Sequence, residues 1–124
     1  MTVTTRTQTP APLIWTTICR LDDLAVDRGA AALVDGRQIA VFRLSWTNTL
    51  YAVGHRDPFT GANVMARGLV GTRGDRATVA SPLHKQVFDL STGEALDYPG
   101  TSLDRWDIRL VDDDVQVRPV EGVR

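Results

Sequence analysis

Cysteine is nearly absent from this sequence, because Cys19 is the only one in 124 residues. A single thiol excludes a disulfide within the chain, and it excludes a thiolate cage for zinc or an iron-sulfur cluster on one chain alone. We expect Cys19 to act as a small hydrophobic residue on an early strand, since it has no second thiol with which to form a redox pair.

The chain also lacks an excess of positive charge and a long hydrophobic run. Lysine and arginine number 14 against 15 aspartate and glutamate, so no broad positive field is available for a phosphate backbone, and nucleic acid is not an expected partner. No apolar segment approaches the roughly 20 residues that cross a bilayer, which predicts no membrane association. The first ten residues lack the apolar core of a signal peptide, so we expect a cytoplasmic protein.

Long amphipathic helices are not indicated either. The apolar segments are short, rich in β-branched and aromatic residues, and separated by Gly, Asp or Asn, which is typical of antiparallel β structure. The expected strands are residues 13–19, 30–34, 38–44, 50–53, 78–80, 86–90, 107–111 and 115–118. Asp35-Gly36 predicts a tight hairpin, because both positions tolerate positive φ. The predicted fold class is all-β, an antiparallel β-barrel or sandwich.

The length fits one domain, which we place at residues 13–119. Residues 1–12, rich in Thr and Pro, are expected to form a flexible N-terminal tail, and residues 120–124 a short C-terminal tail. Residues from about 55 to 99 differ from the outer strands, because they contain two loops rich in Pro and Gly. We predict that this stretch is a small inserted β subdomain.

Two motifs in the inserted stretch carry the functional information. The later one, Ala80-Ser-Pro-Leu-His-Lys-Gln-Val-Phe-Asp-Leu-Ser-Thr-Gly-Glu-Ala-Leu96, resembles the second cluster loop of Rieske [2Fe-2S] domains, Cys-Pro-x-His followed by an aromatic-Asp segment and Thr-Gly. The earlier one, Asp57-Pro-Phe59 followed by Thr-Gly, is similar to the first cluster loop, Cys-x-His. The resemblance covers about residues 15–118 and implies a Rieske-like fold.

The resemblance implies four cluster-ligand positions, here occupied by Asp57, Phe59, Ser81 and His84. A Rieske centre needs two cysteine thiolates on one iron and two imidazoles on the other. A phenyl ring has no lone pair to donate, and a serine hydroxyl is a poor substitute for a soft thiolate. Both cluster loops are therefore interpreted as vestigial, and no metal or cofactor is expected in this chain.

Asp-Pro-Phe in the first loop and Ala-Ser-Pro-Leu in the second make the chain similar to the small subunits of assimilatory NAD(P)H-dependent nitrite reductases. Residues 18–24, 38–42 and 65–68 match that family as well. This resemblance implies a partner, the large catalytic subunit, which is understood to carry FAD, siroheme and an iron-sulfur cluster and to reduce nitrite to ammonium. A chain without metal, flavin, paired thiols or a Gly-x-Gly-x-x-Gly motif would then contribute through contacts, as a non-catalytic accessory subunit.

Two other functions stay open at this point. One is a Rieske-type [2Fe-2S] electron-transfer ferredoxin, which would be coloured when purified and would contain iron and sulfide. The other is a stand-alone, cluster-free interaction module, which a gene for a large subunit in the genomic neighbourhood would argue against.

The residues at the two loops have structural explanations too. Asp57 can stabilise its loop through hydrogen bonds to the backbone. Phe59 is expected to pack in the core and fill the space that a cluster would occupy. Ser81 fits a turn. His55, Asp57 and His84 have the composition of a two-histidine, one-carboxylate iron site. Such a site requires all three to converge, and we expect His84 to be a surface histidine instead.

Five basic residues near the loops are a candidate docking surface for the large subunit: Arg56, Arg67, Arg73, Arg76 and Lys85. In Rieske proteins the cluster-bearing tip meets redox partners, so the resemblance implies a contact here, and arginine is favoured at interfaces. Solvated loops explain the same residues equally well.

Overall fold

The computed structural model describes residues 14–46 and 48–120. The predicted tail at residues 1–12 lies outside this part, as do residues 121–124. None of the described residues forms a helix that is long and apolar enough to cross a membrane.

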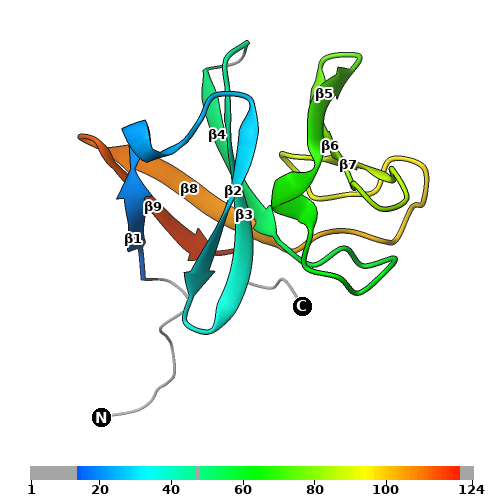
Figure 1. Cartoon of the computed structure of the whole chain (residues 1–124), viewed down its shortest axis with the longest axis horizontal. Coiled ribbons are helices and arrows are strands. Elements are labelled where there is room, and N and C mark those ends of the chain that lie inside the picture. The colour runs from blue at the N-terminus through cyan, green and yellow to red at the C-terminus, as the bar shows by residue number, and fades with distance from the viewer. Residues whose placement is uncertain (1–13, 47, 121–124) are drawn as a thin grey trace.

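A six-stranded antiparallel sheet forms the larger part of the fold (Figure 1). Its strands are β1 (Thr16–Arg20), β2 (Arg28–Val34), β3 (Arg37–Leu44), β4 (Thr49–Gly54), β8 (Arg105–Val111) and β9 (Asp114–Pro119). They follow the order β1-β9-β8-β4-β3-β2, and β1 and β2 approach each other, so the sheet curves into a nearly closed barrel. The predicted all-β class, an antiparallel β-barrel, is confirmed.

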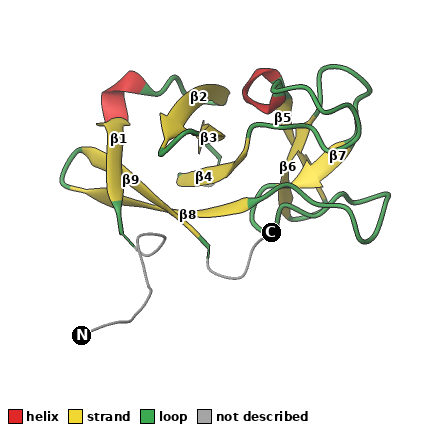
Figure 2. Ribbon diagram, turned by 90° about the horizontal axis from the view of Figure 1, so that it is seen from below, coloured by secondary structure: helices red, strands yellow, loops and turns green. Residues whose placement is uncertain are grey.

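A second, three-stranded sheet lies beside the barrel, with the order β5-β6-β7. It consists of β5 (Leu69–Arg73), β6 (Arg76–Ala80) and β7 (Val87–Asp89), and it falls within the stretch that we expected to be inserted at about 55–99. The 3-10 helix η4 (Met65–Arg67) precedes β5 and lies between β2 and β5 (Figure 2).

Turn chemistry explains two of the hairpins. Asp35 and Gly36 adopt φ values of +50° and +79°, and Val34 pairs with Arg37 across them, so the predicted tight hairpin is confirmed. Strand β5 was not among the predicted strands. Its signal is the two-residue turn after it, where Gly74 takes a φ of +65°.

Strand β3 is buried on both faces and therefore serves two cores. Ile39 and Val41 point into the barrel, where they join Trp106, Val115 and other residues of one hydrophobic cluster. Their neighbours Ala40, Phe42 and Leu44 join the second cluster, which lies between the barrel and the small sheet. Burial of each Leu or Phe side chain stabilises the fold by about 1.5–3 kcal/mol. The residues of β3 that point away from the barrel interior therefore attach the small sheet to the barrel.

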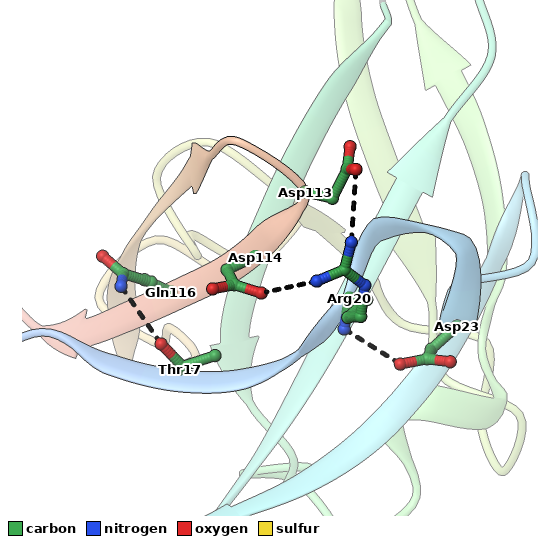
Figure 3. A network of polar contacts seen from close by, with 6 residues as sticks. All are labelled: Thr17, Arg20, Asp23, Asp113, Asp114 and Gln116. Atoms are coloured by element: carbon green, nitrogen blue, oxygen red, sulfur yellow. Dashed lines mark hydrogen bonds and ion pairs between the residues drawn. The ribbon is translucent and has the colours of Figure 1, made fainter.

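A polar network joins β1 to β9, which are paired neighbours in the sheet (Figure 3). The guanidinium of Arg20 donates to Asp113 and Asp114 over 3.2 and 3.3 Å. The backbone N–H of Arg20 also donates to Asp23 over 2.9 Å, at the start of the 3-10 helix η3 (Leu21–Asp23). This hydrogen bond ties Asp23 of η3 to the end of the β1 strand.

Candidate functional site

The two cluster-like loops meet through one hydrogen bond between their first residues. The first loop follows β4, and the second joins β6 to β7. The Ser81 hydroxyl donates to the Asp57 carboxylate over 2.6 Å. Asp57 is 0% exposed and Ser81 is 1% exposed, so this contact is shielded from water. The two positions that carry thiolates in a Rieske centre therefore hold a carboxylate and a hydroxyl bonded to each other.

Asp57 also organises its own loop, as the sequence predicted. Its carboxylate accepts a hydrogen bond from the Phe59 backbone N–H over 2.8 Å. Its backbone N–H donates to the Ala62 carbonyl, and its carbonyl accepts from the Gly61 N–H, over 2.8 and 2.7 Å. A buried carboxylate with two donors is satisfied without a metal ion.

Ser81 has the corresponding role in the second loop. Its hydroxyl oxygen accepts from the Leu83 N–H over 3.3 Å. Its backbone N–H donates to the Gln86 carbonyl, and its carbonyl accepts from the Lys85 N–H, both over 2.9 Å. Lys85 takes a φ of +59°, which lets the chain turn back toward β7. The expected turn at Ser81 is confirmed.

Phe59 does not fill the core, which corrects the expectation from the sequence. Its side chain is 37% exposed. The ring packs on the surface against Tyr98 and Phe88, with centroids 5.1 and 5.9 Å apart. The fully buried side chain of Met65, from η4, belongs instead to the cluster between the barrel and the small sheet. The sequence predicted Phe59 to lie inside, whereas the buried residues that join the two loops are Asp57 and Ser81.

The histidines lie in different surroundings. His84 is exposed, as expected. His55 is buried, and its Nδ1 accepts a hydrogen bond from the Ala66 N–H over 3.1 Å. Only a neutral imidazole can accept at Nδ1, so the neutral form of His55 fixes η4 in place. Burial, and to a smaller extent the charge of Arg67, lowers the pKa of His55. Residues 14–46 and 48–120 contain no group of three His, Cys, Asp or Glu side chains arranged to hold a metal ion.

The Asp-Leu-Ser-Thr-Gly part of the second motif has a structural role. The buried Asp89 carboxylate accepts hydrogen bonds from the Ser91 N–H and hydroxyl, over 2.8 and 2.7 Å, and from the Thr92 N–H. Gly93 follows with a φ of +80°, and a Cβ there would lie 2.5 Å from the Leu103 carbonyl oxygen. This part of the Rieske-like motif shapes a turn and does not depend on a metal.

The residues at the four ligand positions do not fit a [2Fe-2S] cluster. Asp57 and Ser81 bond to each other where two thiolates would be needed, and Phe59 offers no lone pair to iron. Only His84 is of the native type, and one imidazole is insufficient to hold the cluster.

The five basic residues are divided between two ends of the small sheet. Arg73 and Arg76 face each other across the β5–β6 turn, where Arg73 pairs with Asp97 and Arg76 with Asp89. Lys85 follows the opposite end of β6. Arg56 and Arg67 are exposed in and beside the first loop. Arg73 and Arg76 therefore lie at the β5–β6 turn, whereas Arg56, Arg67 and Lys85 lie in or beside the two loops.

Cys19 is partly buried and packs against the barrel cluster. Burial, followed by the charge of Asp23, raises the pKa of the thiol. The thiol is therefore kept protonated and unreactive, in agreement with the expected role as a small hydrophobic residue.

Comparison with known proteins matches residues 14–118 to the Rieske-like [2Fe-2S] domain family. The small subunit of the NADH nitrite reductase of Salmonella typhimurium is 38% identical, over 84% of this chain and 96% of its own length. A crystal structure of a Mycobacterium tuberculosis protein, proposed to be the small subunit of an NADH-dependent nitrite reductase, is 46% identical, with a TM-score of 0.82 over 86% of this chain and 96% of the other. A nitrite reductase large subunit from Klebsiella oxytoca is 35% identical over 77% of this chain, which corresponds to 10% of that subunit.

Proposed function

Since the chain belongs to the family of Rieske-like [2Fe-2S] domains, with relatives that are named as small subunits of nitrite reductase, we propose that it is a cluster-free accessory subunit of an NAD(P)H-dependent nitrite reductase. It binds the large subunit and supports reduction of nitrite to ammonium, as part of nitrite and nitrate assimilation in the cytoplasm. FAD, siroheme and the iron-sulfur cluster belong to the large subunit in this proposal.

The observation that carries the proposal is the hydrogen bond between Asp57 and Ser81. A ferredoxin function needs a redox centre, and this bond occupies the place where its thiolates would be. The bond also keeps both loops in contact without a metal, so the fold retains a defined surface for protein contact. A scaffold of this kind fits an accessory subunit better than an electron carrier.

The large subunit of Klebsiella oxytoca supports the choice of partner. About a tenth of that polypeptide is similar to this chain. When such a domain is fused to a catalytic chain, a linker holds it at its partner. When it is a separate chain, an interface must do so. We therefore assign the corresponding interface of this chain to the large subunit.

Co-expression with the large subunit from the same source tests this function. The complete chain, carrying an affinity tag, should retain the large subunit with its FAD and siroheme. Nitrite-dependent oxidation of NADH or NADPH should fall when the small chain is omitted. Full activity of the large subunit alone, with no complex formed, would contradict the proposal.

A further inference from the structure

A groove separates the barrel from the small sheet, away from the Asp57–Ser81 pair. It has a volume of about 550 Å³, and η4 connects its two walls. One wall contains the first residues of β2 and Trp46, and the other contains the first residues of β5. Figure 2 shows η4 between these two strands. Two side chains at the groove are conspicuously apolar and exposed, Trp46 at 46% and Leu69 at 72%.

Strand β5 presents an open backbone edge to this groove. It is the outer strand of the small sheet, and among the described residues it pairs only with β6. The two-residue turn makes Arg73 and Arg76 a hydrogen-bonded pair, and such pairs alternate along an antiparallel ladder. Val70 and Thr72 therefore direct their N–H and C=O groups outward. Within residues 14–46 and 48–120, no other backbone group bonds to this outer edge.

The charges at the groove are predominantly positive. Arg28 and Arg67 line it, and both side chains are exposed. In the described part of the chain neither of them has an acidic partner within ion-pair distance. The acidic lining residue is Asp27, whose carboxylate oxygens accept hydrogen bonds from the N–H and hydroxyl of Ser45, over 2.8 and 2.7 Å. The groove thus carries two arginines against one carboxylate, with Arg28 on the β2 wall and Arg67 on η4.

We propose that an extended, acidic segment of the large subunit binds in this groove as an additional strand beside β5. Main-chain hydrogen bonds to Val70 and Thr72 would hold the segment, and Arg28 and Arg67 would pair with its carboxylates. Its apolar side chains would cover Trp46 and Leu69. This inference rests on the proposed function and names the surface through which it works.

Three features favour this occupant over others. An unprotected edge strand with an exposed Leu is a template for strand addition, and proteins otherwise cover or charge such edges. The two arginines favour a segment of negative charge and disfavour the pairing of two such grooves with each other. The chain's resemblance to part of a large subunit points to the same partner.

Charge reversal tests the proposal. The complete chain carrying Arg28→Glu and Arg67→Glu should bind the large subunit at least about tenfold more weakly, and the effect should shrink at high salt. Arg105→Glu with Arg109→Glu is the matched control, because it reverses the same number of charges at two exposed positions of β8 outside the groove. It should change the dissociation constant by less than about twofold.

A backbone variant tests the added strand itself. Val70→Pro removes one outward N–H, whereas Val70→Ala keeps it, and both shorten the same partly buried side chain. Val70→Pro should weaken binding at least about tenfold relative to Val70→Ala. Hydrogen exchange on the unmodified chain gives an independent readout, because the Val70 and Thr72 amides should become protected when the large subunit is added.

The outcomes separate the two proposals. If the unmodified chain binds the large subunit but the groove variants bind equally well and the Val70 and Thr72 amides stay exposed, the groove is not the interface, and the accessory function survives. If the unmodified chain does not bind the large subunit, both proposals are wrong. Weakened binding by the charge-reversed chain, together with protection of the two amides, supports the strand addition.

Discussion

The hydroxyl of Ser81 lies 2.6 Å from the carboxylate of Asp57, and this single buried contact joins two loops that are separated by the β5–β6 hairpin. In a Rieske domain the same two positions are joined through iron. Here a hydrogen bond makes the connection, so the loops keep their arrangement without a metal.

Removal of the hydroxyl should therefore destabilise the domain. Ser81→Ala leaves the buried Asp57 carboxylate with one donor fewer, which should lower the free energy of unfolding by about 1–3 kcal/mol. Urea unfolding of the complete chain measures the change. Ser102→Ala, at an exposed serine, is the control and should stay within about 0.5 kcal/mol of the unmodified chain. Equal stability of the two variants would show that the contact is unimportant.

His55 should make stability depend on pH near neutrality. Its pKa is lowered in the folded state from the ordinary value of 6.5, so the unfolded chain binds the proton first as the pH falls. The contribution of His55 is fully present above about pH 6.5 and is lost as the pH falls from there toward the folded pKa. Denaturant unfolding as a function of pH should show this slope.

Two variants isolate the contribution of His55. In His55→Gln the amide oxygen can still accept from the Ala66 N–H, so the variant should fold and lose the slope just below pH 6.5. His84→Gln, at an exposed histidine, should keep the slope. If both variants keep it, another group is responsible.

The approach of η4 to β2 should not tolerate a side chain at Gly29. A Cβ there would clash with the Ala66 carbonyl oxygen, whereas a Cβ at Gly71 would find its nearest neighbour at 3.6 Å. Gly29→Ala should lower the free energy of unfolding by about 1–3 kcal/mol or more, and with it the thermal midpoint, because the backbone must move. Gly71→Ala should be neutral or stabilising, by up to about 1 kcal/mol. Similar midpoints for both variants would contradict the packing described here.

The loops should regain a cluster when the missing ligands are restored. In the combined variant Asp57→Cys, Phe59→His and Ser81→Cys, His84 supplies the fourth ligand, and positions 59 and 84 are both exposed, as the imidazoles of a Rieske tip require. Reconstitution with iron and sulfide should give visible absorption. The same variant with His84→Ala should bind less cluster. Failure of the four-ligand variant to bind any, although folded, would show that the loops have lost the cluster geometry.

The sequence predicted the elements whose signals are local. Asp35-Gly36 predicts its hairpin because both residues accept positive φ, and the apolar, β-branched and aromatic residues at 38–44 predict a strand there. Strand β5 was not predicted, because its apolar segment is only Leu69-Val70 and is followed by Gly71 and the polar Thr72 and Arg73. Local patterns cannot reveal which long-range partner satisfies a polar residue.

The candidate site shows the same division. The loss of cluster ligands could be predicted from residue types alone, because a phenyl ring cannot bind iron in any geometry. The Asp57–Ser81 hydrogen bond could not be predicted, since its partners lie 24 positions apart and their contact depends on how the small sheet packs on the barrel. The surface position of Phe59 beside Tyr98 also depends on long-range packing, so residue type alone wrongly predicts that Phe59 lies in the core.

Iron and acid-labile sulfide in the complete, purified chain test the central claim most directly. If Asp57 and Ser81 replace the thiolates, the chain should be colourless and contain less than about 0.1 iron per molecule, even after reconstitution. A content of about two irons and two sulfides per molecule, with the visible spectrum of a [2Fe-2S] centre, would contradict the account.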